Sequence, residues 1–324
     1  MTKEEELKQN QDNNIHIFYS CNDTFIRHLC TSIASILHNA DKKDLLSFHI
    51  LNNDISQENR NKILNLRKIK KCNIEFIDID NELFKNCPLK KDFPYLTIQS
   101  YYRFIIADIK HSLDKAIYLD CDTVVTSSLS DLWNIDLGDN YCGVVQDMNA
   151  VASHEDEERL NIDAEFNAGV LLINVKKWKD ENISQKLFES VKKLSDENIL
   201  LWMDQDGLNY TFDRQVVWIN PKYNYQKCAV DNLYYTKYTD EEVKHAQDNV
   251  VIIHYNGGEK PWEKRCDFYD IEYYKSLYYA GWRLEALRLF YNHYIKQYLI
   301  YSYEEDRHRV LSIFGIKIKF RKKH

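Results

Sequence analysis

Short apolar segments alternate with amphipathic ones over the first 80 residues of the chain. Residues 15–19, 47–51 and 73–77 have the length and composition of strands. Between them, apolar residues recur at helical spacing from Phe25 to Leu37, and a second such segment follows Ser56. This order predicts a parallel sheet with helices on its faces. Right-handed crossovers then favour a nucleotide-binding type of fold.

The same kind of pattern continues to about residue 265, and we expect residues 15–265 to form one α/β domain. It predicts the following elements: a helix over 98–109, strands over 116–119, 141–145, 170–174 and 250–253, and helices over 183–194 and 206–212. Residues 1–14 form a polar N-terminal extension. Residues 266–324 are rich in Tyr and end in basic residues, and we expect a small helical C-terminal region there.

Composition and charge exclude several classes of function. The 324 residues include 43 Lys and Arg and 50 Asp and Glu, a formal net charge of −7, which argues against a nucleic-acid-binding protein. The eight cysteines contain no Cys-x-x-Cys pair. No apolar stretch reaches the roughly 18 residues of a membrane span. Since the first residues are polar and acidic, we expect a cytoplasmic protein with reduced thiols.

The strand predicted over 116–119 ends in two carboxylates, Asp120 and Asp122. Ligands of open α/β sheets bind just beyond the carboxyl ends of strands. Two acids at such a position repel each other unless a cation lies between them. A hard divalent cation held by few carboxylates commonly shares its other coordination positions with phosphate oxygens. The pattern therefore predicts a site for a metal–phosphate complex.

The Asp-x-Asp pattern is weakly specific by itself. It also occurs at residues 78–80 and 204–206, where a solvated turn or the first turn of a helix accounts for it equally well. Only the copy at Asp120 follows a wholly apolar run and precedes β-branched residues, 123–125. This context distinguishes it from the other two copies.

A histidine supplies a second part of the candidate site. His254 follows the apolar run 250–253, and Gly257, Gly258 and Lys260 come next. Glycines let backbone N–H groups approach a phosphate, and the lysine adds a positive charge. One imidazole, two carboxylates and phosphate oxygens suit Mn²⁺ well and Mg²⁺ less well. The alternative is a hydrogen-bonded structural histidine.

Two further segments place polar groups beside apolar ones. Asp204 and Gln205 open a predicted helix, where acids either complement the helix dipole or contact a polar substrate. Asn167 stands in Phe-Asn-Ala-Gly before a predicted strand, where it either forms a turn or offers its amide to a ligand. Both interpretations stay open at this point.

Taken in order, these motifs resemble glycosyltransferase family 8, in particular the lipooligosaccharide galactosyltransferases and lipopolysaccharide glucosyltransferases of Gram-negative bacteria. The resemblance is carried by seven stretches: 17–25, 100–104, 117–122, 131–133, 166–174, 204–206 and 254–262. It implies a GT-A type fold with a mixed, mainly parallel sheet flanked by helices. It also implies metal-dependent transfer of galactose or glucose from a UDP-sugar donor to a hydroxyl of a lipid-linked glycan acceptor, with retention of configuration.

The resemblance also implies roles for individual residues. The metal, Mn²⁺ or less suitably Mg²⁺, would be bound by Asp120, Asp122 and His254. Gln205 and Asp204 would take the catalytic positions beside the donor sugar, and Asp147 would lie on the acceptor side. The other donor-binding residues would be Ser20, Cys21, Asn22, Thr24, Arg103, Cys121, Asn167, Gly257 and Lys260.

The first loop departs from the family pattern. Asn22 and Thr24 stand where relatives often carry Asp and Asn, which leaves the uridine contacts open. Cys121 replaces the usual aliphatic residue between the two acids, where the side chain need only pack.

The C-terminal region combines aromatic and basic residues. Its last eight residues, 317–324, hold five Lys and Arg and no acid. We expect this region either to pack on the catalytic domain or to contact an anionic membrane surface, which would place the enzyme at the inner face of the cytoplasmic membrane.

Two other functions are consistent with parts of the sequence. A haloacid dehalogenase-type phosphatase would use Asp120 as its nucleophile and Asp122 as an acid or base, although Gly-Thr rather than Thr-Val-Val normally follows that motif. A non-catalytic sugar-binding scaffold would keep the fold without the metal ligands. The oligomeric state stays open.

Overall fold

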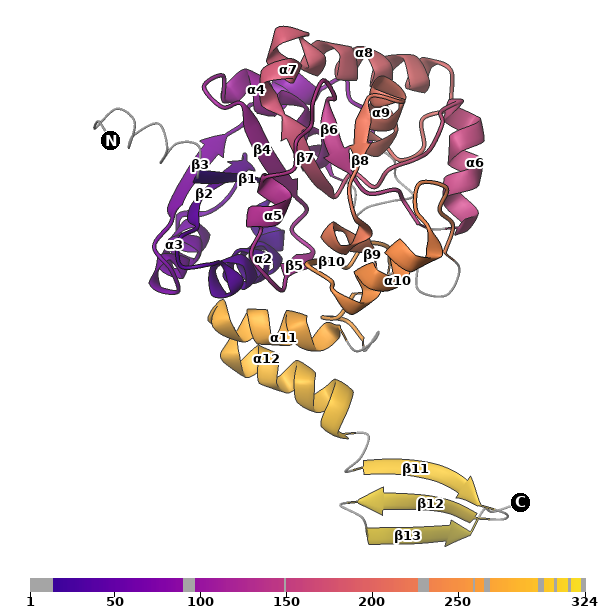
Figure 1. Cartoon of the computed structure of the whole chain (residues 1–324). Coiled ribbons are helices and arrows are strands. Elements are labelled where there is room, and N and C mark those ends of the chain that lie inside the picture. The colour runs from indigo at the N-terminus through magenta and orange to yellow at the C-terminus, as the bar shows by residue number, and fades with distance from the viewer. Residues whose placement is uncertain are drawn as a thin grey trace.

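The main domain is built around a seven-stranded sheet (Figure 1). The computed structural model describes residues 14–89, 97–148, 150–226, 233–258, 260–264, 269–296, 300–305, 308–313 and 316–321. The strand order is β3-β2-β1-β4-β7-β6-β8. The strands are β1 (Asn14–Ser20), β2 (Leu45–Asn52), β3 (Asn73–Asp78), β4 (Lys115–Leu119), β6 (Cys142–Val144), β7 (Val170–Asn174) and β8 (Val216–Trp218).

The sheet is mixed and mainly parallel, as expected. β1 pairs in parallel with β2 and β4, β2 with β3, and β6 with β8, whereas β7 runs antiparallel to both β4 and β6. Since β1 and β4 are parallel neighbours, the segments that follow Ser20 and Leu119 leave the sheet at the same edge.

Helices cover both faces of this sheet, because its strands are apolar on both sides. Ile17 packs with Leu29 of α2 (Ile26–Asn39), whereas its neighbour Phe18 belongs to a separate core with Leu187 of α8 (Ile183–Asp196). The other helices of the domain are α3 (Gln57–Asn65), α4 (Ile106–Ile109), α5 (Ser130–Trp133), α6 (Ala150–Leu160), α7 (Val175–Asp180), α9 (Asp204–Phe212) and α10 (Asp240–Asp248).

Short 3₁₀ segments complete the domain: η1 (Asp23–Phe25), η2 (Leu66–Lys68), η3 (Asn81–Phe84), η4 (Ile98–Ile105) and η5 (Pro221–Tyr223). The helix predicted over 98–109 is therefore mostly 3₁₀, and only its last turn, α4, is α-helical.

A second, smaller sheet brings His254 to the end of β4. Strand β10 (Ile252–His254) lies between β5 (Thr123–Val125), to which it is antiparallel, and β9 (Tyr225–Gln226), to which it is parallel. In this register His254 is paired with Thr123, the residue after Asp122. The pairing joins two segments more than 130 residues apart in the chain.

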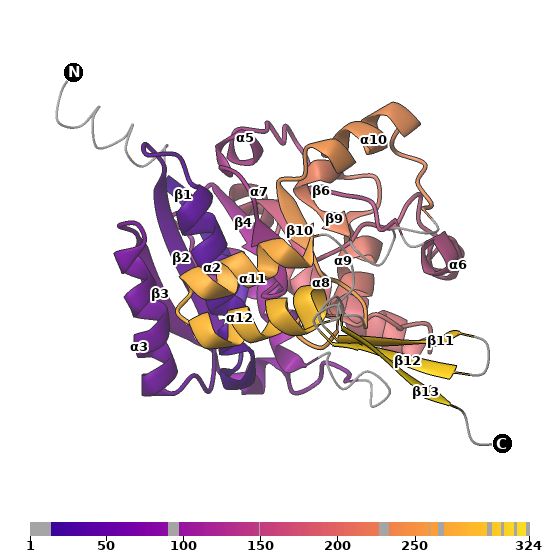
Figure 2. The same ribbon diagram turned by 90° about the horizontal axis from the view of Figure 1, so that it is seen from below.

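The C-terminal region is only partly helical. α11 (Asp270–Tyr279) packs against α2 and against α12 (Arg283–Phe290), and a π-turn, η7 (Tyr291–Ile295), follows (Figure 2). Next comes a three-stranded antiparallel sheet of β11 (Ile300–Glu305), β12 (His308–Ile313) and β13 (Ile316–Arg321). The helical expectation is therefore wrong for residues 300–305, 308–313 and 316–321, which are strands, and in 316–321 apolar and basic residues alternate with the period of a strand.

A search of the described residues finds no helix that combines the length and the apolar character needed to cross a bilayer.

Candidate active site

A cavity of about 340 Å³ lies at the edge of the sheet where β1 and β4 end. It is lined by every residue assigned to the site from the sequence except Thr24. Thr24 is exposed, and its hydroxyl donates to Oδ1 of Asn22 over 2.7 Å. Thr24 therefore supports the first loop of the pocket but does not line it, whereas Ser20, Cys21 and Asn22 do.

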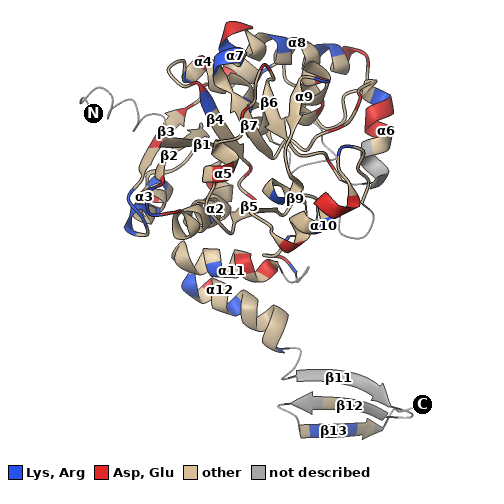
Figure 3. Cartoon of the chain, viewed as in Figure 1, with Lys and Arg blue, Asp and Glu red and all other residues tan. Residues whose placement is uncertain are grey.

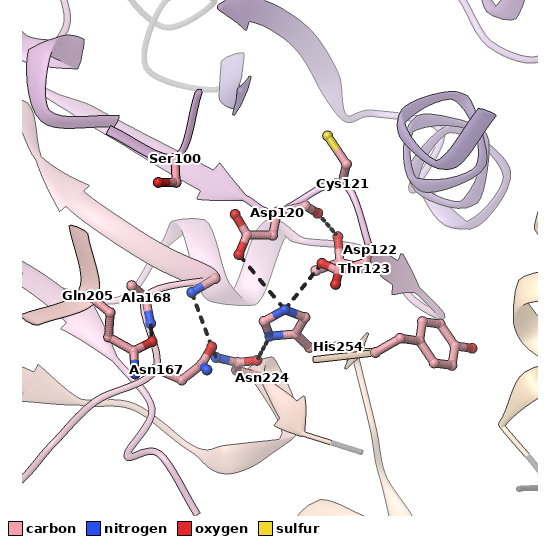
Figure 4. Close-up of polar contacts among 12 residues, drawn as sticks. Ser100, Asp120, Cys121, Asp122, Thr123, Asn167, Ala168, Gln205, Asn224 and His254 are labelled. Carbon is pink, nitrogen blue, oxygen red and sulfur yellow. Dashed lines mark hydrogen bonds and ion pairs between the residues drawn. The ribbon is translucent and has the colours of Figure 1, made fainter. Parts of the chain in front are cut away.

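Asp120, Asp122 and His254 form a compact set of potential metal ligands in this cavity (Figure 4). One donor atom from each lies within 4.8 Å of the other two. Nε2 of His254 is 3.3 Å from Oδ1 of Asp122 and 3.9 Å from Oδ2 of Asp120. Two carboxylate oxygens and one imidazole nitrogen suit a divalent ion such as Mn²⁺.

The tautomer of His254 is set by a residue that sequence reasoning missed. Nδ1 of His254 lies 3.0 Å from Oδ1 of Asn224, which can only accept a hydrogen bond. Nδ1 therefore carries the proton, and the lone pair of Nε2 faces the two carboxylates. Asn224 is buried, and its Nδ2 donates to Oδ1 of Asn167 over 3.0 Å. Asn224 therefore holds the imidazole with Nε2 free to coordinate a metal between Asp120 and Asp122.

Gly169 leaves the space in which these ligands meet. A Cβ atom added at this residue would lie 2.1 Å from Cε1 of His254 and 2.8 Å from Oδ2 of Asp120. No side chain larger than hydrogen fits there without displacing a ligand. The glycine belongs to the Phe-Asn-Ala-Gly stretch that the sequence analysis identified, but that motif did not show that Gly169 makes room for the metal ligands.

Each carboxylate is also paired with a basic side chain. Nζ of Lys260 lies 2.7 Å from Oδ2 of Asp122, and Nη2 of Arg103 lies 2.9 Å from Oδ1 of Asp120. Burial by itself raises the pKa of Asp122, but the charge of Lys260 and its hydrogen bond to this carboxylate oppose burial, and the pKa lies well below its usual range. Asp122 is therefore ionised and available to a cation at neutral pH.

Arg103 connects the metal ligands to the start of helix α9. Its buried guanidinium contacts Asp120 and lies 3.1 Å, through Nε, from Oδ2 of Asp204. Arg103 also donates to the backbone oxygens of Ser100 and Ala168. Burial opposes its charge, yet Asp120 and Asp204 raise the pKa of the guanidinium above its usual value. The positively charged arginine therefore fixes Asp120 and Asp204 relative to each other.

Asp204 and Gln205 face the cavity from the first turn of α9. Asp204 is buried, and burial raises its pKa to about 6, against the opposing charge of Arg103. Met203, just before it, adopts φ 52° and ψ −111°, a backbone conformation that non-glycine residues seldom occupy. Such strain concentrates at functional sites, where surrounding packing holds it.

Further acidic side chains line the side of the cavity away from Lys260. Asp147 accepts a hydrogen bond from Nδ2 of Asn167 over 3.0 Å. Glu165 and Asp156 also line the cavity, together with Trp202, whose Nε1 donates to Asp156. The sequence pattern did not single out Glu165, Asp156 or Trp202, because isolated acids and tryptophans carry no spacing signal.

Comparison with known proteins agrees with this geometry. The model of the family described as "Glycosyl transferase family 8" matches residues 16–266. The chain belongs to glycosyl transferase family 8. A putative glycosyltransferase of Haemophilus influenzae is 33% identical over 78% of this chain and 74% of its own length. Lipopolysaccharide 1,3-galactosyltransferase of Salmonella typhimurium is 30% identical over 76% and 72%, respectively.

A solved structure has the same fold as this family 8 chain. The galactosyltransferase LgtC, crystallised with donor and acceptor sugar analogues, superposes with a TM-score of 0.71 at 29% identity and covers 84% of this chain and 100% of its own. The protein is therefore a glycosyltransferase with a GT-A type fold. The expected glycosyltransferase class and the expected GT-A type fold are both confirmed.

Proposed function

We propose that this family 8 enzyme transfers galactose or glucose from a UDP-sugar to a hydroxyl of a lipid-linked glycan, such as lipopolysaccharide core or lipooligosaccharide, with Mn²⁺ as its metal. The observation that carries the proposal is the convergence of Asp120, Asp122 and His254 in a cavity of nucleotide-sugar size. The names of the Salmonella and LgtC relatives support the hexose and the glycan acceptor.

The residues at the metal end of the cavity suit the departure of a nucleoside diphosphate. Breaking the bond between sugar and diphosphate builds negative charge on the leaving oxygen. Asp120, Asp122 and His254 would hold a divalent metal, which would supply Lewis-acid neutralisation of that charge. Lys260 lies beside Asp122 and can add its positive charge, and Gly257 lines the same wall.

The opposite end of the cavity suits stabilisation of the sugar as it loses its leaving group. Gln205 carries an amide, which is a poor nucleophile, so a covalent intermediate on this residue is disfavoured. We infer retention of configuration, with the acceptor hydroxyl entering on the face that the leaving group vacates. Asp204 would contact the donor sugar, and Asp147 would contact the acceptor. Trapping a covalent sugar adduct on Asp204 would contradict this mechanism.

The phosphatase alternative fits the geometry less well. As a nucleophile, Asp120 would need a carboxylate oxygen directed at the substrate. Oδ1 of Asp120 already accepts from Tyr118 over 3.0 Å and from Arg103, and Oδ2 faces His254. These contacts are those of an oriented metal ligand. The scaffold alternative lacks support because all three ligands are present and converge.

Turnover assays test the proposed reaction directly. We expect release of UDP from one member of a panel of UDP-sugars with Mn²⁺, faster with a lipid-linked glycan acceptor. Asp120→Ala should abolish this turnover, since it removes a metal ligand, while the exposed Asp139→Ala should leave it unchanged. Release of phosphate from phosphomonoesters, with a phosphorylated Asp120, would support the phosphatase instead.

We also propose that the C-terminal region holds the enzyme at the inner face of the cytoplasmic membrane. On α12, Leu284 is 85% exposed and Leu287 56% exposed, with one helical turn between them. On β13, Ile316, Ile318 and Phe320 are exposed and alternate with basic residues (Figure 3). Apolar side chains at headgroup depth favour adhesion to a membrane. Each Lys or Arg near anionic lipid adds about 1 kcal/mol.

Sedimentation with lipid vesicles tests this adhesion. We expect binding to phosphatidylglycerol vesicles at low salt, weaker binding at high salt, and little binding to neutral vesicles. Leu284→Asp together with Leu287→Asp should reduce binding about tenfold or more, because two apolar side chains leave the interface. Leu83→Asp, at a leucine that is 62% exposed on η3, serves as the matched control. Equal binding of all three proteins would contradict the proposal.

A further inference from the structure

Gln205 is held on both sides of its amide by residues of one short segment. The backbone N–H of Ala168 donates to Oε1 of Gln205 over 3.0 Å. Nε2 of Gln205 donates to Oε1 of Glu165 over 2.8 Å. A backbone N–H can only donate, so the atom that faces Ala168 must be the amide oxygen, which places Nε2 at Glu165. The two contacts therefore select a single orientation of the amide and exclude the flipped one.

Glu165 is itself rigidly placed. It is 1% exposed, so its carboxylate has little room to move. Its backbone N–H donates to Oε1 of Glu157 over 3.1 Å, and its backbone oxygen accepts from the N–H of Asp147 over 2.9 Å. These contacts anchor Glu165 between two other buried acids. The Gln205 side chain, which bonds to Glu165, is thereby fixed in position relative to Asp147 and Glu157.

The surroundings of Glu165 disfavour its charge, and the hydrogen bond from Gln205 offsets part of that cost. Burial raises the pKa of Glu165 well above its usual range, and the charges of Asp147 and Asp156 add to this effect. The hydrogen bond from Gln205 acts in the opposite direction and favours the charged form. Removing the donor would leave the buried carboxylate without this compensation, so separating the pair is costly.

We propose that Glu165 is a positioning residue for Gln205, with no contact of its own to the reacting atoms. Glu165 and Ala168 together keep Oε1 of Gln205 beside the donor sugar, where positive charge develops as the diphosphate leaves. This inference rests on the proposed function, in which Gln205 lies next to that sugar. Misplacement of a catalytic group by about 1 Å can reduce turnover about 100-fold, so loss of the Glu165 contact lowers kcat.

Steady-state kinetics and UDP affinity test the proposal. Glu165→Leu removes the acceptor, and we expect kcat to fall about 10- to 100-fold, with KM for the UDP-sugar and Kd for UDP within about twofold of wild type. Glu165→Gln keeps a side-chain carbonyl that accepts from Nε2, so it should restore kcat to within about threefold. Asp44→Asn, at a buried acid that accepts from Ser128 and Ser130 and does not line the cavity, is the matched control and should behave as wild type.

A second readout does not depend on turnover. The side-chain amide signal of Gln205 in a ¹H–¹⁵N spectrum, assigned by its loss in Gln205→Ala, should move in Glu165→Leu and stay near its wild-type position in Glu165→Gln. Wild-type kcat in Glu165→Leu, or a parallel loss of kcat and UDP affinity, would overturn the proposal. Absence of UDP release from every UDP-sugar by the wild-type protein would instead reject the proposed function, while the amide signal still tests the contact.

Discussion

The two ends of the cavity hold the same kind of side chain in opposite electrostatic situations. At the metal end, Asp122 is paired with Lys260 and faces His254, and its pKa lies below the usual range. At the start of α9, burial dominates, and the pKa of Asp204 rises to about 6 even beside Arg103. One end therefore presents ionised ligands to a cation, and the other holds acids whose charge is costly.

This difference shows how one fold separates two tasks. A metal site needs carboxylates that ionise readily, so basic partners lie next to them. A site that stabilises a sugar losing its leaving group benefits from negative charge held in a buried place. Arg103 touches both ends, through Asp120 and Asp204, and therefore links their geometries.

Gly169→Ala should have the largest effect, because it breaks the metal end without removing any ligand. Its Cβ would lie 2.1 Å from Cε1 of His254, so the imidazole must move away from the carboxylates. We expect turnover to fall by at least about 100-fold, with weaker Mn²⁺ binding in calorimetry. Gly138→Ala is the control: its φ of +50° costs an alanine about 1 kcal/mol of stability, but nothing lies within 4 Å of the added Cβ and the residue is outside the cavity, so the folded variant should keep full turnover. Wild-type Mn²⁺ affinity in Gly169→Ala would show that the three ligands do not act together.

The pH dependence of stability should separate the two ends by sign. Since the folded pKa of Asp204, about 6, exceeds its unfolded value of 3.8, its stabilisation is present below about pH 4 and lost as the pH rises through about 6. Asp204→Asn lacks this loss, so the variant should gain about 3 kcal/mol on the wild type between pH 3 and pH 7. Denaturant unfolding across this pH range measures the difference.

Asp122→Asn should show the reverse trend. The lowered pKa of Asp122 makes its contribution present above about pH 4 and lost as the pH falls through the folded value. The variant should therefore lose stability relative to wild type at neutral pH, with the gap closing in acid. The same pH trend in both variants would contradict the comparison between the two ends.

Asn224→Leu should have the smallest effect of these changes, because it removes a residue that orients a metal ligand and leaves all three ligands in place. Loss of the acceptor at Nδ1 frees the imidazole of His254 to rotate and to change tautomer. We expect Mn²⁺ affinity to fall about tenfold, at the lower end for such supporting residues. Asn249→Leu, on the surface after α10, is the control. Equal affinity in the two variants would show that Asn224 does not orient the ligand.

Local sequence patterns were sufficient for much of the fold and for the residues of the metal end. The apolar run before Asp120, and the run before His254, each predict a strand whose carboxyl end carries a ligand. Because strand ends gather at one edge of a sheet, such residues could be assigned to one site before their contacts were known. Apolar and basic residues also alternate in 316–321, yet we expect a helical region there from composition, and the structure has the strand β13 instead.

The sequence by itself determined most strands of the main sheet, the strand that carries His254, and the acids and histidine at the strand ends, because periodicity and strand-end chemistry are local properties of the chain. Only the tertiary structure decided that Asn224 orients His254, that Glu165 holds Gln205 and that Asp122 and Asp204 differ in pKa. These depend on which side chains meet across distant segments and on how much water each loses, and neither is recorded in the local pattern of one sequence.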